Sequence, residues 1–83
     1  MAKIIVYTTE SCPYCVRAKK LLNERGIPFE ERKISYDDDA QWDALYAKSG
    51  MKTVPQIFHG DTVVGGYDDL AALDRENQLA SLR

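Results

Sequence analysis

The sequence predicts an α/β fold in which short strands and amphipathic helices follow one another in the order β-α-β-α-β-β-α. Two observations indicate this order. β-Branched and aromatic residues gather in short runs, as in buried strands, and the segments between the runs repeat apolar residues at helical spacing. With 83 residues and no repeat or linker, the chain is expected to form a single domain over residues 1–83, with room for one sheet covered by helices.

A strand and then a helix open the chain. Residues 3–8, reading Lys-Ile-Ile-Val-Tyr-Thr, predict a buried strand. Beyond it, one helical face carries the apolar residues Cys15, Ala18 and Leu22. Pro13 suits the first helical position, because its missing N–H costs nothing there, and this makes Cys12 the N-cap. Gly26 suits the C′ position that ends the helix.

A second strand and a second helix come next. Residues 29–34 are polar with apolar ends and predict a short edge strand protected by charge, which completes a right-handed βαβ unit. Three aspartates at 37–39 precede a helix over residues 40–49, and acids there stabilise a helix N-terminus. Its expected core face carries Trp42, Leu45 and Tyr46.

The last part of the chain predicts a hairpin and a third helix. After a loop over residues 51–55, strands at 56–59 and 62–65 flank the turn signal Gly60-Asp61. The third helix is expected to begin near Tyr67 or Asp68, with Leu70 and Leu73 on its inner face. Residues 78–82 are expected to extend it or to add a short turn, with Leu79 and Leu82 covering the core.

The charge and hydropathy of the chain exclude several classes of partner. Eleven basic and thirteen acidic residues give a net charge of −2, which offers no footprint for nucleic acid or for an anionic membrane. No apolar run approaches the roughly 20 residues that span a bilayer, and no signal-peptide core precedes the first strand. We therefore expect a cytoplasmic protein, and a monomer.

Both cysteines lie in one motif, Cys12-Pro13-Tyr14-Cys15. Two thiols at this spacing can hold half a zinc site, close a structural disulfide or shuttle electrons. The unpaired N–H groups and the dipole of a helix N-terminus favour an anion, so Cys12 is predicted to be an exposed nucleophile that forms a thiolate. Cys15 lies nearly one helical turn further on and faces the sheet, which suits a resolving thiol.

Three motifs at matching spacings give the chain a family resemblance over essentially all of its length. They are Cys-Pro-Tyr-Cys after the first strand, Thr-Val-Pro before the third, and Gly-Gly-Tyr-Asp-Asp after the fourth. Together they resemble the glutaredoxins, and most closely the small dithiol bacterial type. The resemblance implies a thioredoxin-like fold, with a four-stranded mixed sheet, the first and third helices on one face and the second on the other. It also implies a cis Val54–Pro55 bond and a Val54 backbone opposite Cys12.

The same resemblance implies a glutathione-dependent thiol–disulfide oxidoreductase that reduces protein disulfides and glutathione mixed disulfides. Glutathione is then reductant and co-substrate, with no bound cofactor and no metal, and ribonucleotide reductase is a family-plausible partner. The residues that the resemblance assigns to glutathione are Cys12 and Tyr14 at the sulfur, Thr53 and Val54 with Pro55 at the cysteinyl part, Asp68 at the γ-glutamyl end, and Gly66 and Tyr67 beside it. Relatives often carry a lysine three residues before the first cysteine. This chain has Thr9 there, and Lys52 is predicted to supply the cation.

Two other functions compete with this interpretation. One is a redoxin of the same shape that thioredoxin reductase, a flavoprotein, reduces in place of glutathione. The Gly-Gly-Tyr-Asp-Asp segment argues against it. The other is an iron–sulfur or metal-binding module built on Cys12, Cys15 and His59, and these three ligands would need a dimer or bound glutathione thiols to close the site.

Overall fold

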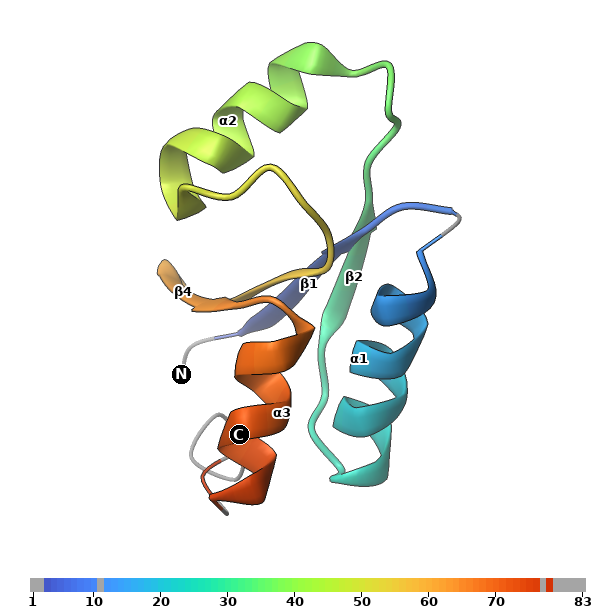
Figure 1. Ribbon diagram of the computed structural model, residues 1–83, viewed down its shortest axis with the longest axis vertical. Helices are drawn as coiled ribbons and strands as arrows, with labels where there is room; N and C mark the ends of the chain where they lie inside the picture. The colour runs from blue at the N-terminus through green and yellow to red at the C-terminus, as the bar shows by residue number, and fades with distance from the viewer. Residues whose placement is uncertain (1–2, 11, 77, 79–83) are drawn as a thin grey trace.

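The computed structural model describes residues 3–10, 12–76 and 78. Its elements follow the predicted order (Figure 1). They are β1 (Ile4–Thr8), α1 (Pro13–Glu24), β2 (Glu30–Lys33), α2 (Asp39–Ser49), β3 (Gln56–His59), β4 (Thr62–Gly65) and α3 (Tyr67–Arg75). Among the described residues, no helix has the length and apolar character needed to cross a bilayer. Residues 79 and 82, predicted to cover the core, lie outside the described residues.

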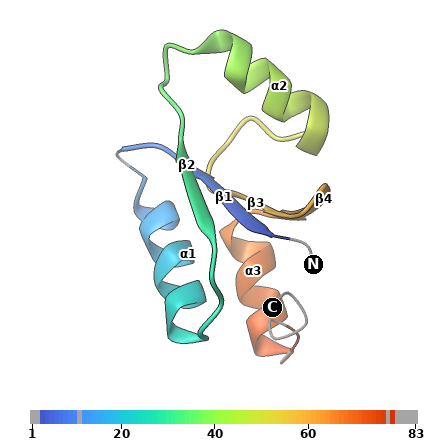
Figure 2. The same cartoon turned by 180° about the vertical axis from the view of Figure 1, so that it is seen from behind.

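The four strands form one mixed sheet in the order β2-β1-β3-β4. β1 runs parallel to β2 and antiparallel to β3, and β4 returns antiparallel to β3. In Figures 1 and 2, α1 and α3 lie together below the sheet and α2 lies above it. This is the thioredoxin-like arrangement that the resemblance implied, and it brings the C-terminal end of β1 and the loop before β3 to one side of the molecule.

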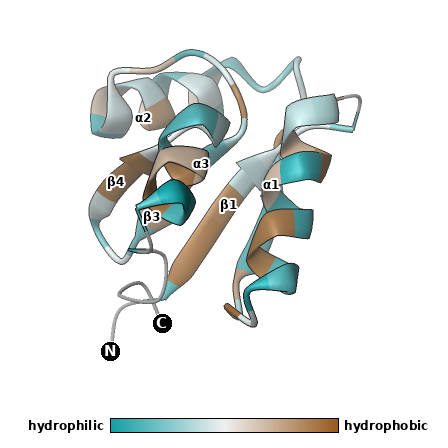
Figure 3. Ribbon diagram, turned by 60° about the horizontal axis from the view of Figure 1, so that its bottom comes forward, coloured by the Kyte–Doolittle hydropathy of each residue, from teal (hydrophilic) through white to brown (hydrophobic). Residues whose placement is uncertain are grey.

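The face of the sheet that α1 and α3 cover holds the larger core. Its buried members come from β1, α1, the turn after α1, β3 and α3, and they are Ile4, Val6, Ala18, Leu22, Ile27, Ile57 and Leu70. Figure 3 shows hydrophobic stretches along β1 and on α1. Because α1 and α3 pack on the same apolar layer, the starts of both helices are held against the sheet.

The opposite face, under α2, holds a smaller core of Tyr7, Ile34, Leu45 and Phe58, with Trp42 packed against it. The prediction that Tyr46 belongs to this core is wrong, since its side chain is 47% exposed. Tyr46 follows Leu45 directly, so it points about 100° around the helix and away from the sheet. α2 is thus attached mainly through Leu45 and Trp42.

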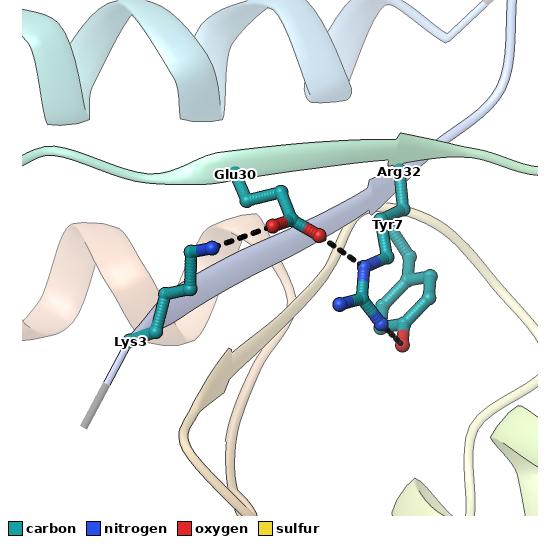
Figure 4. A network of polar contacts seen from close by, with 4 residues as sticks. All are labelled: Lys3, Tyr7, Glu30 and Arg32. Carbon is teal, nitrogen blue, oxygen red and sulfur yellow. Dashed lines mark hydrogen bonds and ion pairs between the residues drawn. The ribbon is translucent and has the colours of Figure 1, made fainter.

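The edge strand β2 is covered by charge, as expected for an exposed edge. Glu30 accepts from Lys3 Nζ at 2.7 Å and also pairs with Arg32. The Arg32 guanidinium in turn donates to the Tyr7 hydroxyl at 3.2 Å (Figure 4). The Arg32–Tyr7 contact joins β2 to β1 through side chains as well as through the backbone, and Lys3 and Glu30 present charge at the open edge.

Candidate active site

Cys12 is the N-cap of α1, with Pro13 in the first turn, as predicted. Its backbone is extended, and its Sγ accepts a hydrogen bond from the Cys15 backbone N–H at 3.1 Å. A sulfur in this position neutralises one of the unpaired donors of the helix and lies at the positive end of its dipole. The Cys12 side chain is half-buried, which is less exposed than the sequence predicted.

Cys15 is buried, with 1% of its surface exposed, and faces the sheet as predicted. Burial, and after it the hydrogen bond to Cys12, raises the pKa of the Cys15 thiol to about 12. A backbone hydrogen bond from Thr9 and the nearby Lys19 ammonium act in the opposite direction. The two sulfurs therefore lie in unlike surroundings, with Cys12 near the surface and Cys15 held as a neutral thiol beneath it.

The loop before β3 passes directly beside Cys12. The Val54–Pro55 bond is cis, and the Cys12 thiol donates to the Val54 carbonyl, with Sγ and O 3.6 Å apart. Pro55 is buried, whereas the Thr53 side chain is exposed. The loop thus presents the backbone of Thr53 and Val54 next to the nucleophilic sulfur.

Gln56 holds this loop in place, and sequence reasoning did not identify its role. Its fully buried amide donates to the Met51 carbonyl at 3.0 Å and to the Thr53 carbonyl at 2.9 Å. Its oxygen accepts from the Ser49 hydroxyl at 2.9 Å. A buried amide with these partners rigidifies the loop, because any displacement would leave polar groups unpaired. The available signal was a polar residue at the start of an apolar strand.

The start of α3 forms the other wall of the site. Gly65 has φ +128°, and a Cβ there would lie 2.1 Å from the Asp69 Oδ2 atom. Glycine at this position lets the Asp69 carboxylate approach and accept the Gly66 backbone N–H at 3.0 Å. Asp69 therefore caps the helix, while its neighbour Asp68 is exposed.

A cavity of about 110 Å³ lies between these walls. It is lined by Tyr14, Thr53, Val54, Pro55, Gly66, Tyr67 and Asp68. The rings of Tyr14 and Tyr67 are 5.9 Å apart between centroids, and the Arg17 guanidinium lies 5.2 Å from the Tyr14 ring centre. The structure thus brings together residues from three distant segments that the sequence analysis named as a binding site, and it places them beside Cys12.

Two residues named in the sequence analysis lie elsewhere. Lys52 does not line this cavity, and its ammonium lies 4.8 Å from the centre of the Tyr46 ring on α2. His59 ends β3, where it pairs with Ile4 and Thr62. Within residues 3–10, 12–76 and 78, no group of three or more His, Cys, Asp or Glu side chains is arranged to hold a metal ion.

This arrangement can perform thiol chemistry on an extended ligand. Cys12 is an accessible sulfur at a helix N-terminus, and Cys15 lies within hydrogen-bond reach of it. The backbone of Val54 lies beside the Cys12 sulfur, where it can pair with a peptide-like chain as an added strand would. At the far end, Asp68 and the N-terminus of α3 offer a carboxylate and N–H donors, which together suit an amino acid with both charges.

Comparison with known proteins gives one consistent result. The glutaredoxin family model matches residues 4–64. The chain is 48% identical to a glutaredoxin of Pseudomonas aeruginosa over 83 residues, which cover 99% of this chain and 96% of that protein. It is 45% identical to glutaredoxin 3 of Escherichia coli over 82 residues, which cover 99% and 98%. The crystal structure of a buckwheat glutaredoxin–glutathione complex superposes with a TM-score of 0.88 at 30% identity, covering 98% of this chain and 76% of that one.

Proposed function

Because this chain belongs to the glutaredoxin family of thiol–disulfide oxidoreductases, we propose that it reduces glutathione mixed disulfides and protein disulfides with glutathione as the electron donor. One observation carries the proposal. The cavity beside the Cys12 sulfur is lined by Tyr14, Thr53, Val54, Pro55, Gly66, Tyr67 and Asp68, the residues that the resemblance assigns to glutathione. A tripeptide bound there would have its sulfur at Cys12.

The reaction begins with attack by the Cys12 thiolate on a disulfide. With a glutathione mixed disulfide, Cys12 attacks the glutathione sulfur, a new S–S bond forms between Cys12 and glutathione, and the other thiol leaves as a thiolate that takes up a proton. The α1 N-terminus stabilises the attacking anion, because it supplies the Cys15 N–H and the positive end of the helix dipole.

Two exits from the mixed disulfide are available. A second glutathione can attack the glutathione sulfur, which releases oxidised glutathione and frees Cys12. Alternatively, Cys15 can attack Cys12, which releases glutathione and closes the Cys12–Cys15 disulfide, and two glutathione molecules then reduce it. When Cys12 is part of a disulfide it carries no charge, and the part of the Cys15 pKa increase that comes from Cys12 is relieved. Cys15 therefore becomes a better nucleophile once Cys12 is occupied.

The residues that line the cavity bind the separate parts of glutathione. The backbone of Thr53 and Val54 pairs with the cysteinyl part, and Asp68 with the helix N-terminus binds the ammonium and the carboxylate of the γ-glutamyl end. Lys52 is the candidate cation for the glycyl carboxylate. To reach it, the ammonium would exchange its contact with the Tyr46 ring for that carboxylate.

The test is turnover of a small glutathione mixed disulfide with glutathione, glutathione reductase and NADPH. The proposal expects steady NADPH consumption that a Cys12→Ser variant lacks. Activity only when thioredoxin reductase replaces the glutathione system would contradict the proposal and favour the redoxin alternative.

A further inference from the structure

A second and larger cavity lies on the α2 side of the same loop. This cavity, the α2 groove, has a volume of about 350 Å³. It is lined by Tyr36, Asp39, Trp42, Asp43, Tyr46 and Lys52. Three of these six residues are aromatic and two are acidic. None of the six lines the cavity beside Cys12, and only Lys52 among them has a role in the chemistry proposed above.

The aromatic wall of the α2 groove is exposed and held in position. The rings of Tyr36 and Trp42 stack at 17°, with centroids 6.1 Å apart. Trp42 Nε1 donates to the Ser35 carbonyl at 3.0 Å, and the Tyr36 hydroxyl is 2.9 Å from the Thr9 hydroxyl. Tyr36 nevertheless leaves 64% of its surface exposed. An exposed ring surface that is already ordered costs a ligand little entropy on binding.

The groove is acidic and favours a cation. Asp39 and Asp43 lie one helical turn apart on α2, and neither forms an ion pair with any described residue. Residues 36–46 contain no lysine or arginine and four aspartates, at 37, 38, 39 and 43. The Lys52 ammonium lies 4.8 Å from the Tyr46 ring centre, so the groove already accommodates a cation over an aromatic face.

The groove also lies next to the reacting sulfur. Lys52 precedes Thr53, which lines the cavity beside Cys12, and the Val54 carbonyl lies 3.6 Å from the Cys12 sulfur. Tyr36 bonds to Thr9, three residues before Cys12. An extended chain advances about 3.3 Å per residue. A polypeptide whose cysteine is at Cys12, and which pairs along Thr53 and Val54 toward Lys52, would bring a residue close to that cysteine in its sequence to the α2 groove.

We propose that the α2 groove binds a lysine or arginine side chain of a polypeptide substrate, close in its sequence to the cysteine whose disulfide is reduced. The proposal rests on the proposed function, because it requires the substrate cysteine at Cys12. Charge complementarity with Asp39 and Asp43, together with the aromatic faces of Tyr36, Trp42 and Tyr46, selects a cation. The groove thereby makes protein-disulfide reduction selective for basic sequences.

The experiment compares three peptide disulfides, each made of two identical peptides joined through one cysteine. The peptides differ only in the residues that flank the cysteine, which are arginine, glutamine or glutamate. Reduction is followed with glutathione, glutathione reductase and NADPH, after subtraction of the rate without the protein. We expect kcat/KM to be about tenfold higher for the arginine disulfide than for the glutamate disulfide at low salt, with glutamine between them and a smaller ratio at high salt.

Two variants test the origin of that ratio. The double variant with Asp39→Asn and Asp43→Asn should lower the ratio of kcat/KM between the arginine and glutamate disulfides to about twofold or less. Glu24→Gln with Asp61→Asn makes the same change in net charge at exposed sites outside the α2 groove and should leave the ratio unchanged. Equal kcat/KM for all three disulfides, or a ratio that survives in the first variant, would overturn the proposal.

The remaining outcomes are also distinguishable. If the groove instead binds a second copy of this chain, sedimentation will show a dimer that Asp39→Asn with Asp43→Asn dissociates, and the peptide ratio will be absent. Each protein is also assayed with a small glutathione mixed disulfide. Failure with that substrate as well as with the peptides would remove the proposed function and this inference with it, whereas normal turnover of it with no peptide preference would remove this inference alone.

Discussion

The two faces of the sheet differ in how completely they are buried. Among the described residues, seven form the core on the α1/α3 face, which also carries the dithiol at the start of α1. The α2 face has four such core residues, and its aromatic residues Tyr36 and Tyr46 are exposed, as Tyr14 and Val16 are on α1. The Tyr46 side chain on α2 faces solvent, although it would add to the buried core if it faced the sheet. The difference indicates that one face supports the reacting groups, while the other presents a surface to a partner.

The loop over residues 51–55 joins the two faces. Gln56 holds this loop in place through hydrogen bonds to the Met51 and Thr53 carbonyls. Within the loop, Lys52 lines the α2 groove, and residues 53–55 line the cavity beside Cys12. Chemistry and recognition are therefore separated by only a few residues of one loop. Changes at the dithiol should therefore remove activity, and changes at exposed residues of the α2 groove should alter substrate preference.

The largest effects are expected at the two cysteines. Cys12→Ser should reduce turnover of every disulfide to the background rate, because no other described thiol is accessible. Cys15→Ser should leave turnover of a small glutathione mixed disulfide within a few-fold of wild type and abolish reduction of protein disulfides, which require the second thiol. NADPH-coupled assays on both substrates measure this. Equal losses on both substrates in Cys15→Ser would argue against two separate exits.

Core truncations should separate the faces by stability. Leu22→Ala, in the larger core, should lower the free energy of unfolding by about 4 kcal/mol, and Leu45→Ala, in the smaller core, by about 2 kcal/mol. The smaller cost is expected because α2 can shift to fill part of the space. Urea unfolding of the reduced proteins checks this, and a larger loss for Leu45→Ala would mean that α2 is the more tightly packed helix.

The buried thiol should make stability fall in alkaline solution. The pKa of Cys15 is raised from 9.0 to about 12 in the folded protein, so above pH 9 the unfolded chain loses this proton while the folded one keeps it. The folded state then binds more protons, and the free energy of unfolding falls as pH rises from 9 toward 12. Denaturant unfolding of reduced wild type and Cys15→Ser over this range isolates the contribution. Parallel curves for the two proteins would contradict it.

The smallest effect is expected at Lys52, between the two cavities. Lys52→Gln should raise KM for a small glutathione mixed disulfide by about threefold if the ammonium reaches the glycyl carboxylate. It should also increase the preference for arginine-flanked peptides, since a competing cation leaves the α2 groove. Lys48→Gln, an exposed change on α2 that does not line the groove, is the control. An unchanged KM would assign Lys52 to the α2 groove alone.

Local chemistry made much of the fold predictable. Pro13, shortly after a β-branched run, located the start of α1 and identified Cys12 as its N-cap, and Gly60-Asp61 located the hairpin. The side of the sheet that each helix covers, and the cis bond before Pro55, came from the family resemblance. Spacing alone does not encode either of these features.

Long-range contacts account for what the sequence did not predict. Tyr46 satisfies a helical period with Trp42, but only the packing of α2 on the sheet decides which edge of that stripe is buried. Gln56 acquires its role from three partners that the fold brings to it. Lys52 lies next to Thr53 in the sequence, yet its side chain turns toward α2 because an aromatic ring is available there.

The most direct test of the account is the position of glutathione on the protein. In a Cys15→Ser variant with glutathione disulfide-bonded to Cys12, backbone amide NMR shifts should change at Thr53, Val54, Gly66, Tyr67 and Asp68 relative to the free variant, and not at Glu24 or Asp61. Changes confined to residues 12–16, with the loop before β3 and the start of α3 unmoved, would show that the tripeptide does not occupy the cavity and would contradict the account.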